Sequence, residues 1–145
     1  MGLIPILAAL LLVAMFGLMG ALPGLVEAQA NTWFVTETGT GNTCSANNPC
    51  ALTTAVTNAA AGDEIRVAEG VYTATTAITL SQAISLTGSY IYSGGGVWSA
   101  EPDVNNVTTL NGQNARRVLY VAANASPAIA NFHIINGAAN NGAGI

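Results

Sequence analysis

Two cysteines, Cys44 and Cys50, are the residues of this chain whose type and spacing best suit chemistry. A cysteine pair can form a disulfide, exchange electrons as a dithiol, or bind zinc as thiolates. Zinc needs four ligands, and the one histidine, His133, lies far along the chain. A redox pair is usually Cys-x-x-Cys, whereas SANNP separates these two. We therefore predict a disulfide, which is the simplest pairing if the chain is exported.

Carboxylates are the next groups able to do chemistry, and they are sparse. Glycoside hydrolysis needs a pair of carboxylates, and a hard cation needs several oxygen ligands. Asp63, Glu64 and Glu69 lie close together in sequence, but residues 107–145 contain no carboxylate. We predict no catalytic residue, no metal site and no cofactor.

Basic residues offer two further candidates. Arg116 and Arg117 could abstract a proton or clamp a sugar acid, but an exposed pair at the start of the strand RVLYV is the interpretation we favour. His133 alternates with two apolar neighbours in NFHII, which predicts a solvated side chain on a sheet face.

The loop of residues 90–106 combines aromatic rings, a run of three glycines and acidic groups. Aromatic platforms with nearby acids could stack on sugar rings; alternatively, the loop folds back and its rings add buried surface. We take it as the candidate carbohydrate-binding surface because loops often carry function. The candidate residues are Tyr90, Tyr92, Trp98, Glu101 and Asp103.

The elements that would position these groups begin after an export signal. Residues 1–30 contain a long apolar run and end in the small-x-small motif AQA, which predicts a cleaved signal peptide. An uncleaved membrane anchor is the alternative, because the run is long enough to span a bilayer. Residues 31–145 carry three basic and six acidic side chains and no lysine. This composition argues against nucleic acid as a partner, since binding it needs clustered cations.

A repeat then predicts the fold. Gly88, Gly112 and Gly137 recur at spacings of 24 and 25 residues, each after Thr or Asn. Short apolar runs lie between them; their residues are Ile65/Val67, Ile78/Leu80, Ile84/Leu86, Val107, Val118/Tyr120, Ile129 and Phe132/Ile134. Short strands at this period, without helices between them, predict an all-β right-handed parallel β-helix with about three strands per coil over residues 64–145. A β-sandwich is the alternative fold.

Three features of the predicted coils follow from this repeat. Thr87, Asn111 and Asn136 should occupy equivalent turns and form a hydrogen-bonded ladder. The glycines after them should supply positive φ angles. We interpret Ile145 as the first residue of another strand, which predicts that further coils and an anchor follow.

A solenoid also needs a cover for its first coil. Leu52, Ala55, Val56 and Ala59 fall on one face of a short helix over residues 50–61, which Gly62 should end. We predict that residues 31–63 form an N-terminal cap with a disulfide loop and this helix, and that the first strand lies in DEIRVAEGVY.

With these residues in hand, the chain resembles the N-terminal part of bacterial secreted β-helix proteins of the pectin-lyase-like superfamily. Within it, the chain is most similar to surface proteins with choice-of-anchor or polymorphic-outer-membrane repeats. The segments that carry the resemblance are TWFVTETGTGNTCSANNPCALTTAV, AAGDEIRVAEGVYT, ISLTGSY and residues 108–145. The superfamily includes lyases, hydrolases, adhesins and scaffolds, so it is more specific for fold than for activity.

The expected function is therefore a non-catalytic, structural segment of a secreted or cell-surface protein, used for adhesion or display. An extracellular polysaccharide or a cell-surface ligand would be the partner. A membrane would be contacted only through the signal peptide or a C-terminal anchor. The alternative is the N-terminal part of a polysaccharide lyase or glycoside hydrolase whose active site lies on further coils.

Overall fold

A computed structural model describes residues 29–73 and 75–145 of the 145-residue chain. The predicted signal peptide lies almost wholly outside this part, in which no helix is long and apolar enough to cross a membrane. The elements in chain order are β1 (Thr32–Val35), α2 (Leu52–Asn58), β2 (Glu64–Ala68), β3 (Gly70–Thr73), β4 (Ile78–Leu80), β5 (Ser85–Tyr90), β6 (Thr108–Asn111), β7 (Leu119–Val121), β8 (Ala128–Ala130) and β9 (Phe132–Ile135).

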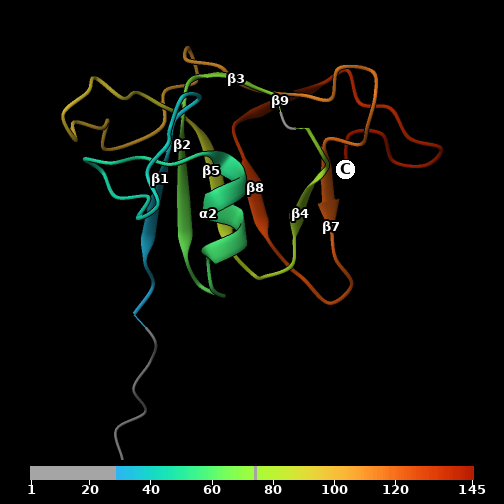
Figure 1. The fold of residues 1–145 in the computed structure, drawn as a ribbon, viewed down its shortest axis with the longest axis horizontal. Coiled ribbons are helices and arrows are strands. Elements are labelled where there is room, and N and C mark those ends of the chain that lie inside the picture. The colour runs from blue at the N-terminus through green and yellow to red at the C-terminus, as the bar shows by residue number, and fades with distance from the viewer. Residues whose placement is uncertain (1–28, 74) are drawn as a thin grey trace, which may run out of the picture.

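These strands form three sheets, and every pairing between them is parallel (Figure 1). The strand orders are β1-β2-β5-β8, β3-β6-β9 and β4-β7, which we call the first, second and third sheets. From β2 onward, successive strands enter the first, second and third sheet in turn. Each strand therefore pairs with the strand three further along the chain. The prediction of an all-β fold with parallel sheets is confirmed.

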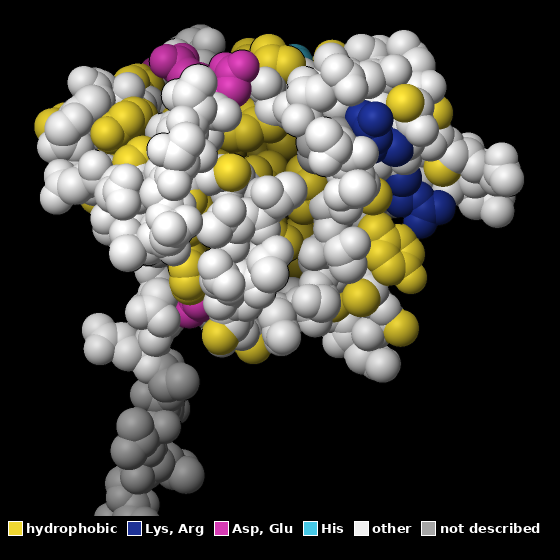
Figure 2. Space-filling model, viewed as in Figure 1, with side chains coloured by type: hydrophobic (Ala, Val, Ile, Leu, Met, Phe, Trp, Pro, Cys, Tyr) yellow, Lys and Arg dark blue, Asp and Glu magenta, His cyan; other side chains and the backbone are white. Residues whose placement is uncertain are grey.

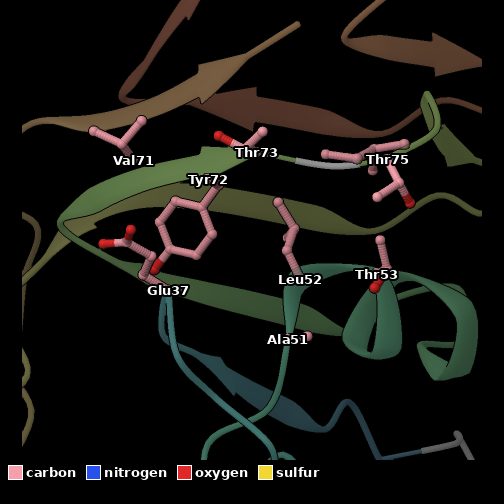
Figure 3. Close-up of a pocket in the computed structure, with 9 residues that line it drawn as sticks. Glu37, Ala51, Leu52, Thr53, Val71, Tyr72, Thr73 and Thr75 are labelled. Carbon is pink, nitrogen blue, oxygen red and sulfur yellow. The ribbon is translucent and has the colours of Figure 1, made fainter. Parts of the chain in front are cut away.

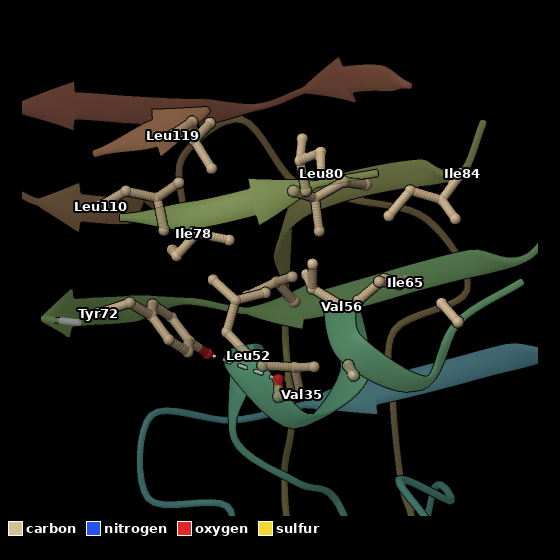
Figure 4. Close-up of a cluster of buried hydrophobic side chains, with 14 of the residues drawn as sticks. Val35, Leu52, Val56, Ile65, Tyr72, Ile78, Leu80, Ile84, Leu110 and Leu119 are labelled. Carbon is tan, nitrogen blue, oxygen red and sulfur yellow. Dashed lines mark hydrogen bonds between the residues drawn. The ribbon is translucent and has the colours of Figure 1, made fainter. Parts of the chain in front are cut away.

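Alternating apolar residues place one side of each sheet in a common core (Figure 4). In the first sheet, Ile65 pairs with Leu86, which pairs with Ile129. In the second sheet, Leu110 pairs with Ile134. Ile65, Leu86 and Leu110 are fully buried. Burying one such side chain contributes about 1.5–3 kcal/mol, so these stacked residues are a main source of stability.

In β7, the residue that faces the core is not the one expected from the sequence. We expected Val118 and Tyr120 to point inward, but Tyr120 is 44% exposed and its neighbour Leu119 is fully buried against the core. Val118 is also buried; it lies just before β7, where the chain bends into the strand and two successive side chains both face inward. Val107, just before β6, is exposed rather than part of a strand.

The first described strand is β1, which was not expected from the sequence. It pairs along its length with β2, from Thr32 opposite Glu64 to Val35 opposite Val67. The expected first strand, DEIRVAEGVY, is divided between β2 and β3 because the chain turns at Gly70, whose φ is 140°. Only glycine adopts such a backbone angle readily.

The disulfide loop covers the outer edge of β1. Phe34 donates its backbone N–H to the Cys44 carbonyl at 2.8 Å and accepts one from Cys50 at 3.0 Å. These bonds occupy backbone groups that an edge strand otherwise leaves open for pairing with another chain. The predicted disulfide between Cys44 and Cys50 is confirmed, with a Cα–Cα distance of 4.7 Å.

The helix α2 lies over the core beside β1, β2 and β4 (Figure 1). Leu52, Ala55, Val56 and Ala59 are buried, as the spacing predicts, whereas Thr53 is exposed. The helix is shorter than the expected range of 50–61. It ends at Asn58, and Gly62 lies in the turn that follows, with φ 92°.

Reduction of the disulfide should loosen this edge. Closing such a short loop should stabilise the fold by roughly 2 kcal/mol, and both cysteines are buried. Mass spectrometry of non-reduced, alkylated protein should find neither thiol modified, and Cys50→Ser should lower the free energy of unfolding by about that amount. Two alkylated cysteines in the native protein would contradict the bridge.

The expected ladder of Thr87, Asn111 and Asn136 forms only in part. Thr87 lies in the first sheet and Asn111 in the second, so the two do not occupy equivalent positions. Asn136 does donate from its Nδ2 to Asn111 Oδ1 at 3.1 Å. The ladder therefore joins two asparagines next to the second sheet.

The repeat glycines have a different role from the one expected. None of the three has a positive φ; residues beside them do, namely Ser89 at 68°, Gln113 at 56° and Asn136 at 51°. A Cβ on Gly112 would lie 2.6 Å from the Asn136 carbonyl oxygen and 2.8 Å from that of Arg116. Glycine is needed there because two backbone segments approach it closely.

Candidate functional site

The candidate aromatic loop folds against the outer face of the first sheet. Trp98 lies between two rings, with centroid distances of 5.0 Å to Phe34 and 4.8 Å to Tyr92. Its indole Nε1 donates to the Ala46 carbonyl at 3.1 Å, so the loop also rests on the disulfide loop. All three rings remain partly exposed. This cluster offers an aromatic surface to solvent.

Tyr90 lies apart from that stack, at the end of β5, where it is only 3% exposed. Its hydroxyl donates to Glu64 Oε1 at 3.4 Å, and the Arg66 guanidinium lies 5.2 Å from its ring centroid. Arg66 and Glu64 also form an ion pair at 3.0 Å. Burial raises the pKa of Tyr90 above its usual value, Arg66 opposes this, and the charges of Glu64 and Glu101 add to it. Tyr90 is thus a neutral, buried neighbour of a charged pair.

The two acidic candidates, Glu101 and Asp103, have different surroundings in the loop. Glu101 is exposed and close enough to act on the pKa of Tyr90. Asp103 Oδ1 accepts the backbone N–H of Asn105 at 2.9 Å and its side-chain Nδ2 at 2.8 Å. Asp103 therefore shapes the loop, while Glu101 faces solvent and acts electrostatically on Tyr90.

The structure brings Tyr92 and Trp98 together and adds two residues that sequence reasoning missed, Phe34 and Arg66. Phe34 lies opposite Arg66 across the β1–β2 pair, so both side chains leave the same face of the sheet. If TWFV had been predicted as a strand, the alternating orientation of strand side chains would have placed Phe34 on the outer face. The resulting surface combines stacked rings with a guanidinium–carboxylate pair, groups able to stack on a sugar ring and hydrogen-bond its hydroxyls.

A second hollow, not anticipated from the sequence, opens between α2 and β3. It is a cleft of about 350 Å³. Figure 3 shows Leu52 between Tyr72 and Glu37 on one side and Thr53 and Thr75 on the other. In the space-filling view, apolar side chains lie at the bottom of a hollow near the centre of the face that carries α2 (Figure 2). The short helix thus leaves part of the core accessible.

Tyr72 forms one wall of this cleft, and its hydroxyl is already engaged. It donates to the Ala68 carbonyl at 3.0 Å and lies 3.5 Å from that of Val35. Burial, and then the charge of Glu37, raise the pKa of Tyr72 far above its usual value. The phenol is therefore a fixed hydrogen-bond donor within the fold, and the exposed carboxylate of Glu37 is the charged group that the cleft presents.

The remaining candidates, Arg116, Arg117 and His133, each have their own surroundings. Arg116 donates to Gln113 at 3.1 Å, and Arg117 contacts the Asn141 carbonyl and lies 5.5 Å from the Tyr120 ring centroid. His133 is exposed on the outer face of β9. In residues 29–73 and 75–145, no three His, Cys, Asp or Glu side chains gather where they could hold a metal ion.

Asp63, in contrast, is a buried acidic residue that is held by hydrogen bonds within the fold. Its carboxylate is 2% exposed and accepts three hydrogen bonds of 2.8–2.9 Å, from the Asn31 and Ala60 backbone N–H groups and the Trp33 indole. Burial raises the pKa of this carboxyl, but these hydrogen bonds, together with one from the Asn31 side chain, lower it more, and the pKa lies below its usual value. Asp63 ties the start of β1 to the end of the cap.

Comparisons with known proteins give no match: no family model, no curated protein and no solved structure is similar to this chain. The function must therefore be argued from the geometry described above.

Proposed function

We propose that this chain is the N-terminal part of an exported right-handed parallel β-helix that acts as a scaffold for adhesion or display, without catalysis. One observation carries the proposal: from β2 to β9, strands enter the three sheets in a fixed rotation and each pairs in parallel with the strand three further along. A chain winding in coils of three strands would give this order. Right-handed winding is the hand that nearly all parallel crossover connections take.

The cap suits such a scaffold at its N-terminal end. The disulfide loop pairs with the edge of β1, and α2 covers the core beside it. Unprotected solenoid ends expose strand edges and apolar interior. The disulfide itself is a bond that persists in oxidising compartments outside the cytosol, which supports an extracellular or cell-surface location.

Carbohydrate is the partner class that the outer face of the first sheet suits best. Phe34, Tyr92 and Trp98 form a partly exposed aromatic cluster, and Glu64 and Arg66 form a partly exposed ion pair on the same sheet. Rings can stack on the apolar faces of sugars, and the charged pair can hydrogen-bond hydroxyl groups. We therefore propose that this surface binds an extracellular polysaccharide.

Trp98→Ala should abolish this binding. We expect the protein to be retarded in native gels that contain soluble β-glucan, pectate or alginate, and the variant to migrate as in an empty gel. Trp98→Phe, which keeps a ring between Phe34 and Tyr92, should retain most of the retardation. Val97→Ala changes a neighbour that is 61% exposed and should behave as the parent.

The thermal midpoint of each variant separates lost binding from lost folding, because Trp98 also contacts the disulfide loop. If the parent protein migrates equally in gels with and without polysaccharide, the carbohydrate-binding surface is refuted.

The same polysaccharides, incubated with the protein with and without calcium, should remain uncleaved. Cleavage that disappears in Arg116→Ala or Arg117→Ala would overturn the non-catalytic role.

A further inference from the structure

Within residues 29–73 and 75–145, no cationic side chain pairs with the buried carboxylate of Asp63. Its hydrogen-bond donors are all neutral: the backbone amides of Asn31 and Ala60, the Trp33 indole N–H and the Asn31 side-chain amide. The nearest acidic neighbour in sequence, Glu64, is engaged separately with Arg66 and Tyr90 on the outer face of β2. A buried charge is costly unless it is paired as well as hydrogen-bonded. The site would therefore be better satisfied if one of its donors carried a positive charge.

One of these donors lies at the predicted processing point. Asn31 follows Ala-Gln-Ala at 28–30, and small residues in this pattern are typical of signal-peptide cleavage sites. Gln29, Ala30 and Asn31 are exposed, so a protease can reach the bond between Ala30 and Asn31. The Asn31 nitrogen donates to Asp63 Oδ1 at 2.8 Å.

We propose that cleavage between Ala30 and Asn31 creates the missing cation, so that the new α-ammonium group of Asn31 pairs with Asp63 and locks the N-terminus onto the fold. An export endopeptidase that accepts small residues adds water across the peptide bond. The carbon–nitrogen bond breaks, the leader departs with the Ala30 carboxylate, and the released Asn31 amine takes up a proton at neutral pH. The ammonium keeps the donor position that the amide held.

This pair has structural consequences beyond one contact. Asp63 also accepts from Trp33 in β1 and from Ala60 beyond α2, and its own carbonyl accepts the Ser85 N–H at 2.9 Å. Asn31 in turn accepts the Glu64 N–H through its carbonyl at 2.9 Å. Processing would thus strengthen the junction of β1, the cap and β2. Stability from the ammonium should be present while that group is protonated and be lost as the pH rises through its pKa.

The absence of lysine from the chain makes this inference directly testable. In a protein of residues 31–145, the α-amine of Asn31 is the only primary amine, so an amine-reactive ester reports on it alone. N-terminal sequencing of the exported full chain should give Asn31 as the first residue. Acylation near pH 7 should be about tenfold slower in the native protein than in urea. A different first residue, or equal acylation rates, would overturn the proposal.

A second measurement keeps Asp63 intact. Protein acetylated at Asn31 in urea and then refolded should melt about 4 °C below the unacetylated protein at pH 6. This difference should vanish at alkaline pH, where the free amine is neutral, and in Asp63→Asn. Identical melting of both forms at pH 6 would refute the ion pair. These readouts do not involve glycans, so they succeed or fail independently of the proposed binding surface.

Discussion

Leu52→Asp should cause the protein to aggregate or fail to fold. Leu52 is 4% exposed and belongs to the core together with Val35, Ile65 and Tyr72 (Figure 4). Removing a buried leucine side chain costs about 2–5 kcal/mol, and the aspartate adds an unpaired buried charge. Domains are stable by only about 5–15 kcal/mol. Displacement of α2 would also expose the core beside β1, leaving surface on which chains can associate.

Thr53→Asp is the matched control, because it places the same charge one residue further along the same helix. Thr53 is exposed, so this change should leave the thermal midpoint and the soluble yield close to those of the parent. Size-exclusion chromatography and thermal unfolding of the two variants provide the comparison. If both variants remain soluble and melt alike, α2 does not cover the core in solution.

Local patterns were sufficient to predict the cap helix and the disulfide. The buried positions of α2 follow from a helical period that Leu52, Ala55 and Val56 make visible. The disulfide follows from two cysteines that have no alternative partner in a compact loop. The helix end was predicted less well, because alanine is compatible with both helix and turn, and the chain leaves the helix before Gly62.

Strand pairing was harder to predict, because it depends on contacts between distant residues. The loop between β5 and β6 separates Gly88 from Gly112, so equal spacing of the glycines did not mean equal position in the sheets. β1 was missed because TWFV is short and lacks clear alternation of apolar and polar residues; its pairing with β2 identifies it as a strand.

The candidate site was predicted in part for the same reason. Tyr92 and Trp98 stack, as neighbours in a compact loop can. Tyr90, two residues earlier, belongs to β5, and the sheet turns its ring toward Arg66 instead. Only the register between β1 and β2 reveals that Phe34 joins the aromatic cluster.

Gly112→Asn should be strongly destabilising, because glycine at this position provides space and does not have a positive φ. A Cβ at this position would meet the carbonyl oxygens of Asn136 and Arg116 and lie 2.9 Å from the Cα of Gly137. All three atoms belong to the backbone, so no side chain can move to make room. Overpacking of this kind costs about 1–3 kcal/mol or more, and displacement of the Asn136 backbone would also break its side-chain bond to Asn111.

Gly95→Asn provides the contrast. Gly95 has a φ of 58° and no atom within 4 Å of the position a Cβ would take, and asparagine tolerates this left-handed region better than most residues. If glycine at 112 serves to give the chain room, urea unfolding should show a loss of several kcal/mol for Gly112→Asn and well under 1 kcal/mol for Gly95→Asn. Were glycine needed at 112 for its backbone angle, asparagine would be tolerated at both positions. Similar unfolding midpoints for the two variants would therefore reject the close approach of the strands at Gly112, and with it the stacking of β6 against β9 at this corner.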